Sequence, residues 1–366
     1  MKSIPFIKPH LPSISKLSAD IEKMYTNLVF SNGGEFEMQF ESKTAEYLGN
    51  DVDVVAVSNA TVGLLISLKA LGLTKGYILL PSFTFAATVE AVLYSGLTPV
   101  FVDVDEKDWS MVINDEVENF LKQENVVAIL FCNPFGIEGS IIAWEKLAKQ
   151  YEVPLICDSA AGFGSDYSDS TKMGTKGDIE VFSLHATKTF AVGEGGLVVT
   201  KDAKIAEDVR RLRNFGFNKD RIVVEPGING KMGEIYSIIG LHVLGTIDEM
   251  VSKKHHILKI YKKYLNNHVF IHPKSINSAL QFLPICFPTE KDRRIAEDAL
   301  QKNIIGCKRY YYPALHNHIA FKDIMRIGQL TGTTQLENCI LALPTYFDLT
   351  DIQIKFICKI INKSLI

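Results

Sequence analysis

The sequence lacks the marks of several large classes of protein. It contains no CxxC pair, so its scattered cysteines are expected to be reduced, mostly buried thiols, neither a disulfide framework nor a zinc site. No apolar run is long enough to span a bilayer, the N-terminus has no signal-peptide core, and no repeat or low-complexity tract occurs. These absences predict a cytoplasmic protein without a membrane partner. The cysteines are Cys132, Cys157, Cys286, Cys307, Cys339 and Cys358.

Neither sign of charge dominates the composition. Thirty-nine Lys and Arg stand against 42 Asp and Glu, a net charge of -3, which gives no reason to expect a nucleic acid or an anionic membrane as partner. No GxGxxG motif follows the first predicted strand, which excludes a Rossmann dehydrogenase. A chain of 366 residues, 47% hydrophobic and 22% charged, is typical of a globular protein with two domains.

Short β-rich runs alternate with helical patterns in the first half of the chain. This alternation predicts an α/β architecture with a mostly parallel sheet flanked by helices. The predicted strands are residues 52–57, 77–80, 99–104, 126–131 and 154–156, followed by two further β-rich runs at 181–183 and 197–200.

The second half of the chain predicts long helices and then a mixed region. One helix is expected at residues 232–250, and a basic helical stretch at 251–264 would bridge to a smaller domain. We therefore predict a large domain, residues 1–250 including an N-terminal entry segment, and a C-terminal domain, residues 251–366, that mixes strands and helices.

Four polar or aromatic residues follow the carboxyl ends of predicted strands. They are Thr61, Phe85, Asp158 and Ser183. Ligands of mostly parallel α/β sheets bind outside these strand ends. The sequence therefore predicts that the four residues converge on one ligand site.

A lysine, Lys188, lies between two β-rich runs in the stretch V-F-S-L-H-A-T-K-T-F-A-V-G-E-G-G-L-V-V-T. A hydroxyl upstream and the glycines downstream suit Schiff-base chemistry, because only a partly desolvated, neutral amine attacks a carbonyl, and glycine lets the backbone approach a cofactor. The alternative is a surface lysine in a hairpin loop.

Two polar turns are candidate ligand contacts. The turn S-N-A-T after the first strand leads into a helix, whose free N–H groups and dipole favour a phosphate, with the Thr61 hydroxyl adding a hydrogen bond. Alternatively, Ser58 or Thr61 simply caps the helix. The turn containing Gly33 is either a plain turn or a loop that admits a bulky ligand.

Five motifs in this order resemble the DegT/DnrJ/EryC1/StrS family of pyridoxal-phosphate sugar aminotransferases. They are S-N-A-T-V-G-L, P-S-F-T-F-A-A-T with G-L-T-P-V-F-V-D-V-D, F-S-L-H-A-T-K with G-E-G-G, G-I-N-G-K-M-G-E, and L-A-L-P-T-Y-F-D-L-T. The resemblance covers nearly the whole chain. It implies a fold type I transferase: a large domain with a mostly parallel seven-stranded sheet, plus a smaller C-terminal α+β domain.

The resemblance also implies roles for single residues around pyridoxal 5'-phosphate. Lys188 would form the Schiff base with the cofactor and later move the proton between carbons. Asp158 would pair with the pyridine nitrogen and keep the ring protonated, so that it accepts electrons. Phe85 would stack on the ring face. The cofactor phosphate would be held by Thr61, the Val62 backbone, Ser183 and, from the other subunit, Asn229, which implies a homodimer.

The implied reaction is transfer of the amine of L-glutamate to a nucleotide-linked 4-keto-6-deoxyhexose, dTDP-linked by expectation, for O-antigen or related polysaccharide biosynthesis. Amination of a 3-keto sugar is the alternative. A sugar dehydratase of the same fold has histidine in place of the lysine, and a non-catalytic regulator need not retain Lys188 and Asp158. The residues expected near the sugar nucleotide are Gly33, Arg309, Tyr310 and His316.

Two positions depart from the family pattern. Three residues after Asp158, where the family has Gln or His against the cofactor's ring hydroxyl, stands Ala161. Its methyl side chain cannot donate a hydrogen bond, so water or another side chain must replace the contact, or the Schiff base is tuned differently. The second departure is Phe135, where tyrosine is common, and no large consequence is expected.

Overall fold

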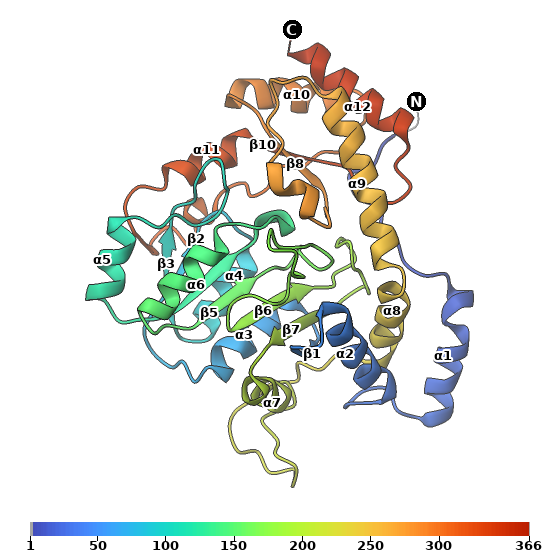
Figure 1. Ribbon diagram of the computed structural model, residues 1–366, viewed down its shortest axis with the longest axis vertical. Coiled ribbons are helices and arrows are strands. Elements are labelled where there is room, and N and C mark those ends of the chain that lie inside the picture. The colour runs from blue at the N-terminus through green and yellow to red at the C-terminus, as the bar shows by residue number, and fades with distance from the viewer. Residues whose placement is uncertain (1–2, 366) are drawn as a thin grey trace.

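The structure of the chain, a computed structural model, describes residues 3–365 and contains two sheets (Figure 1). The large sheet has the strand order β1-β7-β6-β5-β4-β2-β3-β9, in which only β7 runs antiparallel to its neighbours. The predicted α/β class is confirmed; a two-residue edge strand, β9, joins the seven strands. The bounds are β1 Asp53–Val57, β2 Tyr77–Pro81, β3 Thr98–Val102, β4 Val126–Cys132, β5 Leu155–Asp158, β6 Ile179–Ser183, β7 Gly196–Thr200 and β9 Met325–Arg326.

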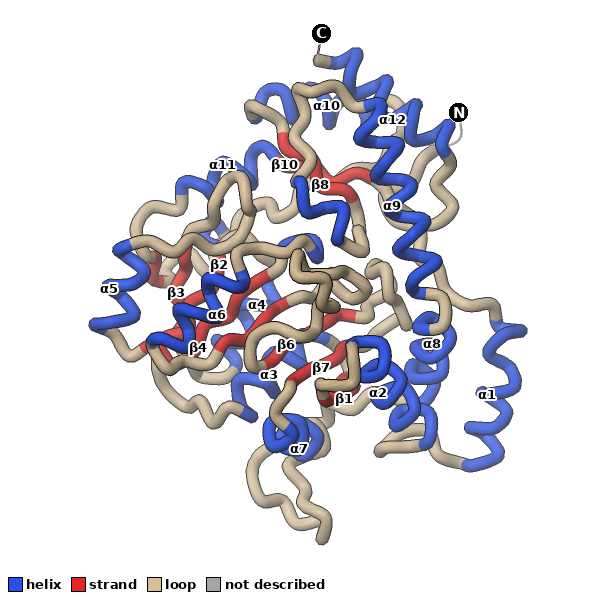
Figure 2. Tube along the Cα trace, viewed as in Figure 1, coloured by secondary structure: helices blue, strands red, loops and turns tan. Residues whose placement is uncertain are grey.

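Helices cover both faces of this sheet, as the tube view shows (Figure 2). On β1, Val54 and Ala56 face one apolar core while Val55 and Val57 face another, because successive strand side chains point to opposite sides. The helices are α1 Ile14–Asn27, α2 Glu35–Leu48, α3 Ala60–Ala70, α4 Ala86–Tyr94, α5 Asp115–Gln123, α6 Ile141–Gln150, α7 Ala203–Leu212, α8 Glu234–Leu244, α9 Ile247–Tyr264, α10 Glu290–Lys302, α11 Thr331–Cys339 and α12 Asp351–Ser364.

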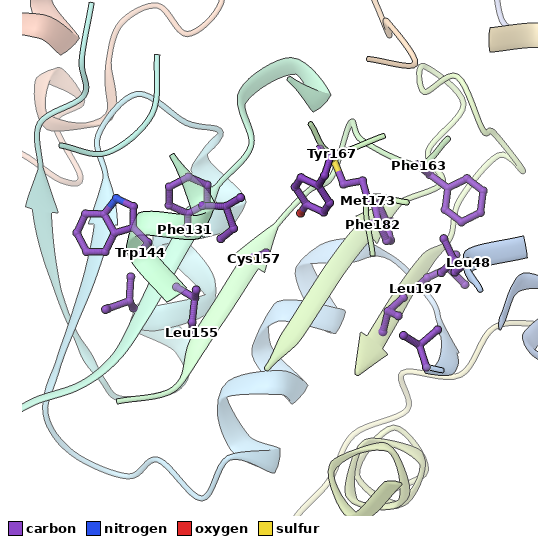
Figure 3. Packing of buried hydrophobic residues seen from close by; sticks show 14 of the residues in the cluster. Leu48, Phe131, Trp144, Leu155, Cys157, Phe163, Tyr167, Met173, Phe182 and Leu197 are labelled. Carbon is purple, nitrogen blue, oxygen red and sulfur yellow. The ribbon is translucent and has the colours of Figure 1, made fainter. Parts of the chain in front are cut away.

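The core on the side of α2 and α6 is rich in large side chains. Phe131 and Trp144 lie at one end of it, and Phe163 and Phe182 lie at the other (Figure 3). Burial of each such aromatic removes about 150–250 Å² from water, which makes the sheet a rigid platform for its loops.

One predicted helix is wrong in its extent. Residues 232–250 do not form a single helix: α8 ends at Leu244, and α9 begins at Ile247 and continues to Tyr264. Glycine costs about 1 kcal/mol in a helix interior, and Gly245 is followed by Thr246 with non-helical angles of φ -126° and ψ 4°. The chain therefore breaks between the two helices.

The second sheet pairs β8, Leu283–Cys286, with β10, Ile340–Leu343, and lies at the top of Figure 1 with α10 and α12. Its own apolar core takes residues from α9, α10 and α12 and also Ile4 from the N-terminal segment. The predicted boundary at residue 250 falls inside α9, and it stays a prediction. Residues 1–2 and 366 of the predicted domains lie outside the described residues.

No helix within residues 3–365 combines the length and the apolar character that crossing a membrane requires.

Candidate active site

The candidate site lies at the carboxyl edge of the large sheet. Strands β2, β4, β5 and β6 are parallel, so their last residues end at one edge. Asp158 is the last residue of β5 and Ser183 the last residue of β6, while Phe85 precedes α4. Thr61 lies in the first turn of α3, directly after β1. The structure thus places all four residues at the strand ends that the sequence predicts.

Lys188 lies in the loop between β6 and β7. The loop is closed by backbone hydrogen bonds from Leu184 N to Gly195 O and from Ala186 N to Gly193 O, at 2.8 Å each. Gly193 has φ +108°, a conformation that favours glycine. The Lys188 side chain is half-buried, and its Nζ donates to Gln281 Oε1 over 3.1 Å. A lysine held in this way is not a freely solvated hairpin residue.

The environment of Lys188 increases the neutral fraction of its amine. Burial lowers the pKa of Lys188 to about 8, although the nearby Asp158 carboxylate acts in the opposite direction. A neutral fraction is therefore available near physiological pH, which nucleophilic attack on a carbonyl requires.

Asp158 is a buried carboxyl group with two hydrogen-bond donors. Its Oδ2 accepts from the Thr88 hydroxyl over 2.7 Å, and its Oδ1 accepts from the Ala160 N–H over 3.2 Å. Burial raises the pKa of Asp158, while both hydrogen bonds and the charge of Lys188 stabilise the ionised form. Such a buried carboxylate can form an ion pair with a protonated ring nitrogen.

The start of α3 forms a polar turn against β7. A side chain at Gly196 would place its Cβ 2.6 Å from the Asn59 carbonyl carbon, so the close approach requires glycine. The helix cap is Asn59, whose Oδ1 accepts from the Val62 N–H over 2.9 Å, and not Ser58 or Thr61. The half-buried Thr61 hydroxyl is not used for capping, which leaves it available to an anion at this helix end.

Two further predicted cofactor contacts lie on exposed surfaces. The side chain of Phe85 is 62% exposed, which leaves its ring faces open for a partner. Asn229 is exposed next to Gly230, whose carbonyl accepts from the Ser58 N–H over 2.7 Å and so holds this segment beside the end of β1.

The four residues predicted near the sugar nucleotide contact different parts of the chain. Arg309 donates to the carbonyl of Glu337 in α11 over 3.1 Å, and Tyr310 stacks on Phe282 with centroids 4.8 Å apart. Buried His316 lies at the end of β2, where its Nδ1 is 2.7 Å from Ser82 Oγ. Gly33 is exposed in a turn with φ +75°. Only His316 is tied to the carboxyl edge of a large-sheet strand by these contacts.

Sequence reasoning missed two polar contacts of the site. Thr88 lies within the same F-T-F-A-A-T stretch as Phe85, one helical turn further, so its spacing was a usable signal. Gln281 contacts Lys188 although the two residues are 93 positions apart. No local sequence pattern predicts a contact over this separation.

The chain is similar to a known family and to named relatives over nearly its whole length. A model of the "DegT/DnrJ/EryC1/StrS aminotransferase family" matches residues 14–362. A relative from Escherichia coli named "dTDP-4-amino-4,6-dideoxy-D-glucose transaminase" is 30% identical over 96% of this chain and 95% of its own length. "GDP-perosamine synthase" of Escherichia coli O157:H7 is 30% identical over 99% of both chains.

A solved structure has the same fold over almost its full length. It is described as a "Putative PLP-dependent aminotransferase from Bacillus cereus ATCC 10987", with a TM-score of 0.91 and 26% sequence identity. The superposition covers 99% of this chain and 100% of that chain.

Proposed function

The chain belongs to the DegT/DnrJ/EryC1/StrS aminotransferase family, and we propose that it aminates carbon 4 of a nucleotide-linked 4-keto-6-deoxyhexose. It is a sugar aminotransferase dependent on pyridoxal phosphate. The likeness to the Escherichia coli transaminase, whose name places the amine at carbon 4 of a dTDP-linked sugar, supports the proposal. The equally similar relative named for a GDP-linked sugar leaves GDP as the competing nucleotide.

The observed side chains fit the cofactor. A buried carboxylate, Asp158, suits a protonated ring nitrogen, and an exposed aromatic face, Phe85, suits stacking on the ring. The amine of Lys188 has a lowered pKa, and the start of α3 suits a phosphate. The bound cofactor supplies an electron sink for charge that develops on carbon.

Lys188 is proposed to hold the cofactor and to transfer the proton. Lys188 lies in the β6–β7 loop, near enough to Asp158 for the carboxylate charge to raise the pKa of its amine. Burial lowers this pKa, so a fraction of the amine is neutral. When the cofactor is released from it, the neutral Nζ would accept the proton that leaves the amine-bearing carbon of the amino donor and would pass it to the cofactor. The left-handed conformation of Gly193 and the hydrogen bonds to the carbonyls of Gly193 and Gly195 give this loop its backbone shape.

Asp158 is proposed to keep the ring nitrogen protonated. The Thr88 hydroxyl and the Ala160 N–H hold both carboxylate oxygens, which fixes the orientation of the group. Since the carboxyl group is buried, its charge acts through a medium of low dielectric and is little screened by water.

Thr61, Val62 and Ser183 are proposed to hold the phosphate, with Asn229 contributed by a second copy of the chain in a homodimer. The Val62 N–H would exchange its Asn59 acceptor for a phosphate oxygen. L-glutamate is the proposed amino donor. The six cysteines are unpaired thiols, which supports a reducing compartment such as the cytoplasm.

Product analysis tests the proposal. The purified enzyme, loaded with cofactor and L-glutamate, is incubated with dTDP- and GDP-linked 4-keto-6-deoxyhexoses and with the corresponding 3-keto sugars. We expect an amine at carbon 4 in the NMR spectrum of one 4-keto product. Amination of the 3-keto sugars alone would replace the proposal by carbon-3 transfer, and loss of a hydroxyl without amination would indicate a dehydratase.

A further inference from the structure

With alanine at position 161, the proposed site lacks a hydrogen-bonding side chain at this position. Pyridoxal phosphate has a ring hydroxyl next to the carbon to which a lysine attaches, and this oxygen carries negative charge when the lysine linkage is protonated. The methyl side chain of Ala161 offers it no hydrogen bond. A polar side chain that lies close to Lys188 Nζ is in a position to contact this oxygen.

Gln281 is such a group. Its Oε1 accepts from Lys188 Nζ over 3.1 Å, and its Nε2 donates to Thr187 Oγ1 over 3.2 Å. A primary amide has two donor hydrogens, so the same side chain can serve an oxygen that stands next to the lysine nitrogen.

The backbone that carries Gln281 is fixed at successive carbonyl groups. The Thr189 hydroxyl donates to Ala279 O over 2.9 Å. Lys254 Nζ donates to Leu280 O over 2.7 Å, and the Thr345 hydroxyl lies 3.0 Å from both Leu280 O and Gln281 O. Ala279 and Leu280 are fully buried. This anchoring holds the amide in place before any ligand binds, as positioned polar groups in active sites require.

We propose that Gln281 supplies the hydrogen bond to the cofactor's ring hydroxyl that Ala161 cannot supply. The assignment rests on the proposed role of Lys188 as the lysine bound to the cofactor. The contact joins the C-terminal part of the chain to the reacting nitrogen. A hydrogen bond from the amide stabilises the negative charge on the ring oxygen. The oxygen then stabilises the protonated lysine linkage less, so the pKa of the linkage is lowered.

The test is a pH titration of the visible absorbance of the purified holoenzyme. We compare wild type with Gln281→Ala and with Gln281→Met, which keeps the length of the side chain without the amide. Both variants should raise the pKa of the linkage by about one unit, as expected for one lost hydrogen bond to a charged oxygen. The exposed Gln301→Ala, in α10, should leave it unchanged.

Rescue makes the test specific. In the double variant Ala161→Gln, Gln281→Ala, a glutamine stands at the position where the family pattern has Gln or His, and the pKa should return toward the wild-type value. Other titratable groups around Lys188, namely Lys8, His10, Lys254, Tyr346 and Asp158, are unchanged in all variants and act equally on each titration.

Two outcomes overturn the inference. An unchanged pKa in both Gln281 variants means that the amide does not touch the ring oxygen, and a lowered pKa means that it acts only as an acceptor for the lysine nitrogen. If wild type loaded with pyridoxal phosphate shows no visible imine band at any pH, the proposed function fails instead, and the two failures are distinguishable.

Discussion

The Thr88 hydroxyl donates a hydrogen bond to Asp158 Oδ2 over 2.7 Å and thereby joins the first turn of α4 to the end of β5. Thr88 is itself buried and lies 3.0 Å from the Thr84 hydroxyl. The hydrogen bonds between Thr84 and Thr88 and from Thr88 to Asp158 therefore fix the orientation of the carboxylate that is proposed to contact the ring nitrogen. Thr88 is a positioning residue in this account.

Replacing Thr88 by valine removes the hydroxyl and keeps the shape. One hydrogen bond to a charged group contributes about 1.5–3 kcal/mol, so the half-reaction with L-glutamate should slow at least about tenfold. Stopped-flow absorbance of the holoenzyme measures this rate. Thr88→Ser, which keeps the hydroxyl, should stay close to wild type. Equal rates in Thr88→Val and wild type would contradict the positioning role.

Replacing Asp158 by asparagine removes the negative charge with little change in shape. The ring nitrogen should lose its proton more easily, and proton abstraction should slow by orders of magnitude, since about 1.4 kcal/mol corresponds to a tenfold change in rate. Cofactor affinity, measured by equilibrium dialysis, should change less because the contacts to the phosphate remain. The control is Asp105→Asn, at a turn where Asp105 accepts from Lys107 N and Asp108 N. A wild-type half-reaction in Asp158→Asn would exclude the proposed role.

The sequence predicts most of the large sheet because its strands are short β-branched runs separated by helices. The same logic locates Asp158 and Ser183, since each is simply the last residue of its strand. Local pattern failed at Gly245, where a helical periodicity continues through a real break. It also failed at the start of α3, where Ser58 and Thr61 were the expected alternatives for the cap and the structure uses Asn59, which lies between them.

The contacts from the C-terminal part of the chain were not predictable from local pattern. Gln281 reaches Lys188 only because buried donors hold residues 279–281 against the β6–β7 loop. Such pairings depend on how two sheets are packed, which hydrophobic periodicity does not encode.

The shared site can be tested by mixing two inactive chains. Lys188→Ala lacks the proposed cofactor lysine, and Asn229→Ala lacks the proposed contact to the partner's phosphate. If each site combines both chains, a mixed dimer contains one site with both defects and one site with neither, so activity should reappear after exchange of subunits. Mixing Lys188→Ala with itself is the control. Demonstrated heterodimers without regained activity would count against a shared site.

The buried amine of Lys254 predicts a pH dependence of stability. Burial lowers its pKa from 10.5 to about 7, so between these values the unfolded chain binds more protons than the folded chain. The free energy of unfolding contributed by this group therefore rises with pH across that window. Urea unfolding at pH 7, 8 and 9 should show wild type gaining stability relative to Lys254→Met as pH rises. The exposed Lys259→Met, on the same helix, should show no such trend, and parallel curves for wild type and Lys254→Met would refute the prediction.

The central claim is that Lys188 is the residue that binds the cofactor covalently. Reduction of the holoenzyme with borohydride fixes the cofactor to its lysine, and proteolysis followed by mass spectrometry identifies the labelled peptide. Lys254, a buried lysine that lines one small pocket together with Lys188, provides an internal comparison. The account predicts that the label lies on Lys188 and is lost in Lys188→Ala; a label on Lys254, or on any other lysine of the wild-type enzyme, would contradict it.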